Sequence, residues 1–120
     1  MGLDMYLTAR KGSEEPIQIG YWRKANSIHN WMVTKVQNNV DDCSRYELTF
    51  ENIIELFHLC KGILNNNFLP DELPPVNGFF FGSTEIDSYY YECLNKTVDF
   101  LSVALEHQRN GYIIEYQSCW

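Results

Sequence analysis

Residues 3–21 read LDMYLTARKGSEEPIQIGY, and this stretch decides the fold. Its first half alternates apolar leucine and methionine with Asp4, Tyr6 and Thr8, the period-two pattern of a β-strand. Glycine, serine and proline in residues 11–16 favour a turn, and the alternation then resumes. The stretch therefore predicts an antiparallel β-hairpin at the start of the chain.

Three helices are expected after the hairpin. Apolar positions recur with helical period over about residues 24–38, and again after Thr49, a residue type that favours the N-cap position. A third helix is expected to begin near residues 83–87 and to stop at Asn110-Gly111. Residues 46–48 could form a short strand, and residues 112–117 are predicted to form the last one.

The order β-β-α-(β)-α-α-β predicts an α+β fold. We expect a small antiparallel sheet of three or four strands, with three helices packed mainly on one face. The first and last strands are candidates for neighbours in this sheet. At 120 residues, without an internal repeat or a linker, the chain is expected to form a single domain, residues 1–120.

Charge and cysteine content narrow the class of protein. The net charge is -7, which argues against a protein that binds bulk nucleic acid through its phosphates. No apolar run approaches the length of a membrane span, so we expect no membrane partner. The four cysteines show no C-x-x-C spacing and follow no secretory signal, so we expect reduced thiols in the cytoplasm.

The usual enzyme motifs are absent from the sequence, including the P-loop and H-E-x-x-H. Asp41 and Asp42 are adjacent, and adjacent carboxylates rarely converge on one ligand, so we interpret them as an acidic turn. Cys43 as a nucleophile would need His29 as its base, and no histidine or cysteine pair has structural-zinc spacing. We therefore predict no catalytic residue, no metal and no cofactor.

The stretch GYWRKANSIHNW, residues 20–31, is the first candidate for a binding site. Arg23 and Lys24 stand at the expected helix start, where the helix dipole makes positive charge unfavourable by roughly 0.3–1 kcal/mol. A bound anion would reverse this effect. The alternative is that Arg23 pairs with Asp41 or Asp42 and that the neighbouring tryptophan only packs.

The stretch NGFFFGSTE, residues 77–85, is the second candidate. Three successive phenylalanines in an extended segment cannot all face the core, so at least one is expected to line a cleft. Ser83 and Thr84 could offer hydroxyls and backbone amides to an anion, or could simply cap the third helix. Tyr89, near the start of that helix, could also reach the pocket.

Together these stretches predict one ligand pocket. We expect a tryptophan and a phenylalanine to stack on a base, Arg23 to hold phosphate with weaker support from Lys24, and polar side chains to read the ligand edges. The predicted ligand-binding residues are Tyr21, Trp22, Arg23, Lys24, Asn26, His29, Phe79, Phe80, Phe81, Ser83, Thr84 and Tyr89.

The chain resembles a family of small phage and prophage proteins. The resemblance is carried by MGLDMYL, GYWRKANSIHNW, VDDC, GFFFGSTEIDSYYYE and the terminal QSCW, and it covers essentially the whole chain. The segment between the first two strands is shorter here than in many members of that family. The resemblance implies a setting, the cytoplasm of an infected bacterium, and implies no particular activity.

In that setting the residues favour a protein that sequesters a nucleotide-derived immune signal. Its partner would be a small anionic, nucleotide-like ligand, enclosed if the protein forms a homodimer. One alternative is an inhibitor that docks on a host defence protein, as anti-CRISPR proteins do, through an acidic or aromatic patch. A second alternative is a small nucleotide hydrolase with His29 as its base.

Overall fold

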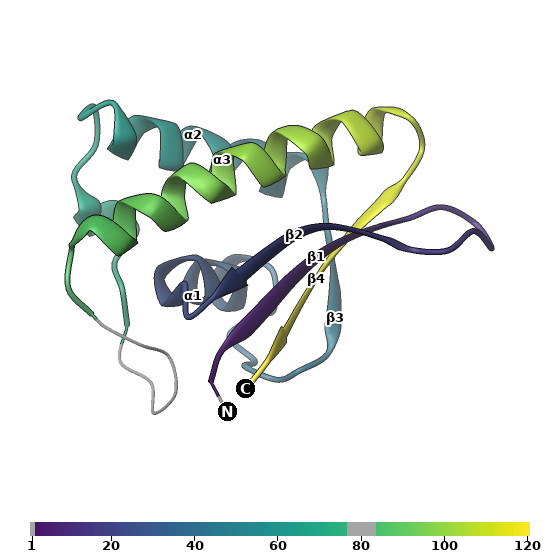
Figure 1. The fold of residues 1–120 in the computed structure, drawn as a ribbon, viewed down its shortest axis with the longest axis horizontal. Helices are drawn as coiled ribbons and strands as arrows, with labels where there is room; N and C mark the ends of the chain where they lie inside the picture. The colour runs from purple at the N-terminus through teal and green to yellow at the C-terminus, as the bar shows by residue number, and fades with distance from the viewer. Residues whose placement is uncertain (1, 77–83) are drawn as a thin grey trace.

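The computed structural model describes residues 2–76 and 84–120. It confirms the predicted α+β fold, with a four-stranded antiparallel sheet and three helices (Figure 1). The elements in chain order are β1 (Asp4–Arg10), β2 (Ile17–Arg23), α1 (Asn26–Lys35), β3 (Arg45–Leu48), α2 (Phe50–Leu64), a short 3-10 helix (Pro70–Glu72), α3 (Ser88–Arg109) and β4 (Ile113–Cys119).

The sheet has the strand order β2-β1-β4-β3, with every neighbouring pair antiparallel. In the register, Tyr6 of β1 lies opposite Tyr21 of β2 on one side and opposite Gln117 of β4 on the other. The expectation that the first and last strands are neighbours is thus confirmed. Because Asp4 pairs with Cys119, the two ends of the chain lie side by side (Figure 1).

The two faces of the sheet differ in burial. Met5, Leu7 and Ala9 of β1 are fully buried, whereas the alternate side chains of the strand are only half-buried. Helix α3 contacts β2, β1 and β4, and α2 contacts α3 and β3, so the helices cover the buried face. The opposite face, which we call the open face, is polar because the period of a strand sends every second side chain there.

Local signals explain where α2 begins. Thr49 occupies the N-cap position, and its Oγ1 accepts a hydrogen bond from the Asn52 backbone N–H at 3.1 Å. The Asn52 side chain in turn accepts from the Thr49 N–H at 3.0 Å, which completes a capping box. The predicted N-cap at Thr49 is confirmed.

One predicted helix start and one predicted helix cap need correction. Helix α1 begins at Asn26, two residues later than expected. Lys24 adopts a left-handed backbone with φ of 55°, so the helical conformation cannot extend back to it from Asn26. Helix α3 is capped by Asp87, whose carboxylate accepts from the Tyr90 N–H, and not by Thr84. Ser83, the other expected cap, lies outside the described residues.

Trp22 anchors α3 on the buried face of the sheet. Its indole N–H donates to Thr97 Oγ1 at 2.9 Å, and the Phe100 ring packs edge-on against it at 5.1 Å between centroids. Gly20, two residues earlier in β2, leaves the room that this ring occupies. A Cβ at that position would lie only 2.8 Å from Cγ and Cδ2 of Phe100.

We expect Gly20→Ala to lower the free energy of unfolding by about 1–3 kcal/mol, because the added methyl group overpacks this contact. Urea unfolding of the purified protein measures the change. In a Phe100→Ala background the same substitution should cost less than about 0.5 kcal/mol, since the ring is gone. An equal cost in both backgrounds would refute the close approach of Gly20 and Phe100.

Candidate functional site

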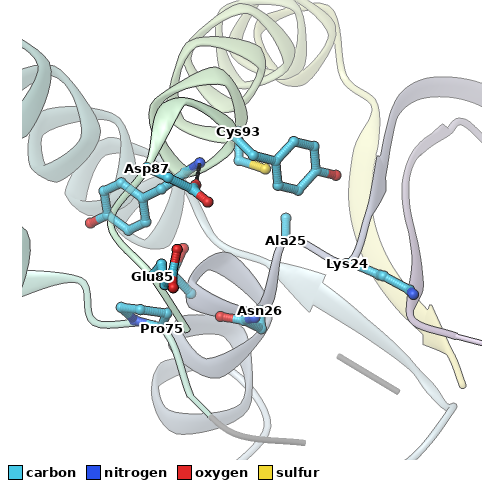
Figure 2. Close-up of a pocket in the computed structure, with 10 residues that line it drawn as sticks. Lys24, Ala25, Asn26, Pro75, Glu85, Asp87 and Cys93 are labelled. Atoms are coloured by element: carbon cyan, nitrogen blue, oxygen red, sulfur yellow. Dashed lines mark hydrogen bonds between the residues drawn. The ribbon is translucent and has the colours of Figure 1, made fainter. Parts of the chain in front are cut away.

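A small pocket lies where the first turns of α1 and α3 meet (Figure 2). Its walls are the turn at Lys24 and Ala25, the beginning of α1, Pro75 and the beginning of α3 with Tyr89. Its volume is about 20 Å³, which holds roughly one water molecule. A nucleotide therefore does not fit in this pocket alone.

The charge of the pocket also disfavours an anion. Glu85 and Asp87 both line it, and Figure 2 shows them on the same side, while the Lys24 side chain extends away from them. The Asp87 carboxylate is already used as the cap of α3. The pocket wall is thus acidic, and the expected phosphate site is not inside it.

Helix α1 begins without a side-chain cap. Ala25 is its N-cap residue, and its first turn contains no acidic residue. Asn26, although buried, uses its Oδ1 to accept the Val76 N–H at 3.2 Å, which ties the segment before the second candidate stretch to α1. Figure 2 places the Glu85 carboxylate beside Asn26, where negative charge complements the positive end of the α1 dipole.

Of the predicted residues that the structure describes, Lys24, Asn26 and Tyr89 line the pocket. Trp22, predicted to bind the ligand, lies in β2, is 1% exposed and packs in the core. His29 is likewise 1% exposed and faces the core. Thr84 is exposed and does not line the pocket. Phe79, Phe80, Phe81 and Ser83 lie outside the described residues.

His29 takes part in a buried chain of hydrogen bonds that the sequence did not reveal. Its Nδ1 lies 2.7 Å from the hydroxyl of Tyr116 in β4, and its Nε2 lies 2.8 Å from Oδ1 of Asp41. The indole N–H of Trp120 donates to the same Asp41 oxygen at 3.2 Å. The Asp41 side chain is 38% exposed, so this series of hydrogen bonds runs from the core to the surface.

Each of these hydrogen bonds to His29 has one donor and one acceptor when the imidazole is neutral. The Tyr116 hydroxyl then donates to Nδ1, and the N–H at Nε2 donates to the Asp41 carboxylate. Burial lowers the pKa of His29, and the hydrogen bond and charge of Asp41 oppose this only in part. Burial also raises the pKa of Tyr116 well above its usual value, so the phenol remains a donor.

The lowered His29 pKa predicts acid sensitivity. Below the ordinary value of 6.5, the unfolded chain takes up a proton that the folded protein refuses. The free energy of unfolding should therefore fall as the pH drops from 6.5 toward the folded pKa, by up to about 1.4 kcal/mol per pH unit. Urea unfolding at several pH values measures this slope.

Two matched variants show whether His29 causes this pH dependence. His29→Gln should flatten the slope just below pH 6.5, whereas His58→Gln, at an exposed position of α2, should leave it unchanged. An NMR titration of the His29 ring gives the folded pKa directly, even if the first variant is poorly folded. A pKa of His29 at or above 6.5 in the folded protein would contradict a buried, neutral His29.

Four of the predicted residues do gather at the end of β2, and two of them, Lys24 and Tyr89, also line the pocket. Tyr21 and Arg23 are exposed on the open face, alternating with buried Trp22. The Tyr89 hydroxyl, from the first turn of α3, donates to the Arg23 backbone carbonyl. We call Tyr21, Arg23, Lys24 and Tyr89 the β2-end surface.

Both phenols of the β2-end surface stay protonated at neutral pH. The hydrogen bond that the Tyr21 hydroxyl donates to Asp4 raises the pKa of Tyr21. Burial is the main cause that raises the pKa of Tyr89 to about 12. Tyr21 and Tyr89 remain 39% and 40% exposed, respectively, so part of each residue is accessible to a ligand.

Arg23 does not pair with the carboxylates that the sequence offered as an alternative. Asp41 bonds to His29 and Trp120, and Asp42 accepts hydrogen bonds from Tyr46 and Ser44. Within residues 2–76 and 84–120, Arg23 forms no ion pair. Its guanidinium is thus available to an anion from solution.

A second hollow, missed by the sequence analysis, lies at the far end of the helices. This groove, of about 450 Å³, is lined by Phe50 and Ile54 at the start of α2 and by Leu105, Gln108 and Arg109 at the end of α3. Phe50 is 57% exposed. In the sequence, the one indication of this groove is an apolar Phe50 directly after the N-cap Thr49. That Phe50 borders a groove follows only from the packing of α2 on α3.

Other possible sites find little support. Among the residues that the structure describes, no group of three or more histidine, cysteine or acidic side chains could hold a metal ion. Both ring nitrogens of His29 are close to partners other than Cys43, the nucleophile considered above. No helix in the described ranges is long and apolar enough to cross a membrane.

Comparison of the chain with protein-family models, with curated proteins and with solved structures gives no match to any of them.

Proposed function

We propose that this protein binds a small anionic ligand with an aromatic ring, such as a nucleotide, on the β2-end surface. The observation that carries the proposal is the exposed Arg23 side chain, which has no ion-pair partner in the described part of the chain. Tyr21 lies two positions earlier on the same face of β2, and the Tyr89 hydroxyl contacts the Arg23 carbonyl. Arginine binds phosphate through parallel N–H groups, and a tyrosine face stacks on a base.

In this proposal each residue has a role. Arg23 would hold a phosphate, with Lys24 as an additional positive charge. Tyr21 offers its ring, which is oriented by the hydrogen bond to Asp4 and by the Tyr6 ring, 5.5 Å away between centroids. Tyr89, fixed by its bond to the Arg23 carbonyl, offers a second ring from the other side of the strand.

The biological setting is part of the proposal. The resemblance to phage proteins favours an infected bacterium, where a protein of this kind would withhold a nucleotide-derived immune signal from the host effector. The β2-end surface leaves one side of a ligand in water. A second copy of the chain across the edge strand β2 would enclose it, and light scattering with and without ligand measures that assembly.

A ligand screen tests the proposal. Cyclic mononucleotides, cyclic dinucleotides and ADP-ribose derivatives are tested by thermal shift and then by calorimetry, and we expect at least one to raise the melting temperature. Arg23→Gln should weaken its binding about tenfold or more, because a charge-assisted hydrogen bond is lost. Chromatography of the recovered ligand should show it intact; a product would favour the hydrolase instead.

Arg45→Gln is the matched control. Arg45 is also exposed, at the opposite edge of the sheet in β3, where its guanidinium contacts Gln117. Its replacement should change the affinity less than about twofold. Equal losses in the two variants, or a screen in which no compound shifts the melting temperature, would refute binding at the β2-end surface.

The alternative function, docking on a host defence protein, is favoured by the groove at Phe50. An exposed aromatic side chain beside an apolar hollow is the kind of anchor that protein interfaces use. The net charge of -7 would also steer the protein toward a basic partner.

Under this alternative, Phe50→Ser should abolish capture of a host protein, while leaving any nucleotide-induced thermal shift unchanged. Val40→Ser, at another exposed apolar position after α1, should leave capture intact. Affinity purification from infected cells compares the three proteins. Retention of the same host protein by both variants would exclude the groove as the docking site.

A further inference from the structure

Two of the four cysteines, Cys43 and Cys119, lie just beyond the paired residues of β3 and β4, at the same end of the two strands. In this antiparallel pair Arg45 lies opposite Gln117 and Tyr46 lies opposite Tyr116. Because the strands are antiparallel, the start of β3 lies beside the end of β4. This pairing ends at Arg45 and Gln117, and the chain before it bends at Asp42 and Cys43.

Hydrogen bonds show that the segment before β3 stays beside β4 past the last paired residues. The Gln117 side-chain amide donates to the Cys43 carbonyl at 2.9 Å, and the Ser118 hydroxyl donates to the Asp42 carbonyl at 3.2 Å. Figure 1 shows the same arrangement, with the chain that enters β3 and the end of β4 at one end of the molecule.

This placement suits a covalent bond. Trp120, which follows Cys119, donates to Asp41, two residues before Cys43, so the two cysteines lie in segments that contact each other. A disulfide needs Cα atoms about 4.4–6.8 Å apart. Both Cys43 and Cys119 are exposed and have free thiols. Cys60 and Cys93 are buried, and burial raises the pKa of Cys60 to about 12. Only the first pair is thus accessible to an oxidant.

We propose that Cys43 and Cys119 are a redox modification site, at which a small disulfide such as oxidised glutathione forms a reversible intramolecular disulfide. One thiolate attacks the glutathione disulfide, whose S–S bond breaks and releases one glutathione. The second thiolate attacks the resulting mixed disulfide and releases the other glutathione. The two protein thiols are oxidised, and one glutathione disulfide is reduced to two thiols that take up the two protons.

The bond would fasten the surface end of the buried hydrogen-bond chain. Asp41 precedes Cys43 by two residues, and Trp120, which donates to Asp41, follows Cys119 directly. Closing the long loop between residues 43 and 119 also restricts the unfolded chain. Oxidation should therefore raise the melting temperature by at least about 5 °C.

Mass spectrometry tests the bond. The reduced full chain is incubated with oxidised glutathione, denatured and alkylated, and its intact mass should show two alkylated cysteines where the reduced control shows four. A tryptic digest without reductant should contain residues 36–45 linked to residues 110–120. Dithiothreitol should separate these two peptides and return the melting temperature to that of the reduced protein.

Cys43→Ser and Cys119→Ser are the controls, each at an exposed position. Neither variant should give the linked peptide or the rise in melting temperature. The proposal is overturned if all four thiols remain free, if glutathione stays on each exposed cysteine, if the disulfide joins two chains, or if the linked peptides contain Cys60 or Cys93.

Discussion

The hydrogen-bond chain from Tyr116 through His29 to Asp41 holds one end of this molecule together. Helix α1 has ten residues and no side-chain cap, and an isolated helix of that length is marginal in water. Its position depends on the apolar side chains that it buries and on the link between His29 and the central strand β4. Asp41 extends this link to the segment that leads into β3.

This chain fixes geometry as well as adding stability. A buried polar group without a partner costs about 1–3 kcal/mol, so α1 cannot rotate or shift along the sheet without losing its match to Tyr116. The same requirement brings the residues after α1 beside the end of β4. The proposed cysteine pair and the proton-sensitive histidine thus depend on one arrangement, in which a surface carboxylate and a buried imidazole meet.

Much of the fold was readable from local patterns because local interactions produce it. The alternation in β1 and β2 and the capping box at Thr49 involve residues close together in the chain. Trp22 was predicted to bind a ligand, because the left-handed backbone at Lys24, which separates β2 from α1, cannot be read from the residue type. In a strand the same tryptophan must face away from Arg23, which is why one became core and the other surface.

The candidate sites were less predictable because they depend on pairing between distant segments. The register of β3 on β4 decides whether Cys43 and Cys119 meet, and Phe50 borders a groove only where α2 packs on α3. A sequence shows neither the register of a four-residue strand nor the packing of two helices. The partner of Asp41 was likewise hidden, since His29 lies twelve positions earlier in the chain.

The position of the cations now has a physical explanation. Arg23 and Lys24 lie at the end of a strand and not in the first turn of α1, so the helix dipole does not oppose them as strongly as expected. Around them the protein is acidic: Asp4 lies opposite Arg23 in the register, and Glu85 and Asp87 line the adjacent pocket. A polyanion would meet these carboxylates with every phosphate beyond the first. A small anion can contact Arg23 and the tyrosine rings alone, so the acidic surroundings favour a small ligand over a nucleic acid.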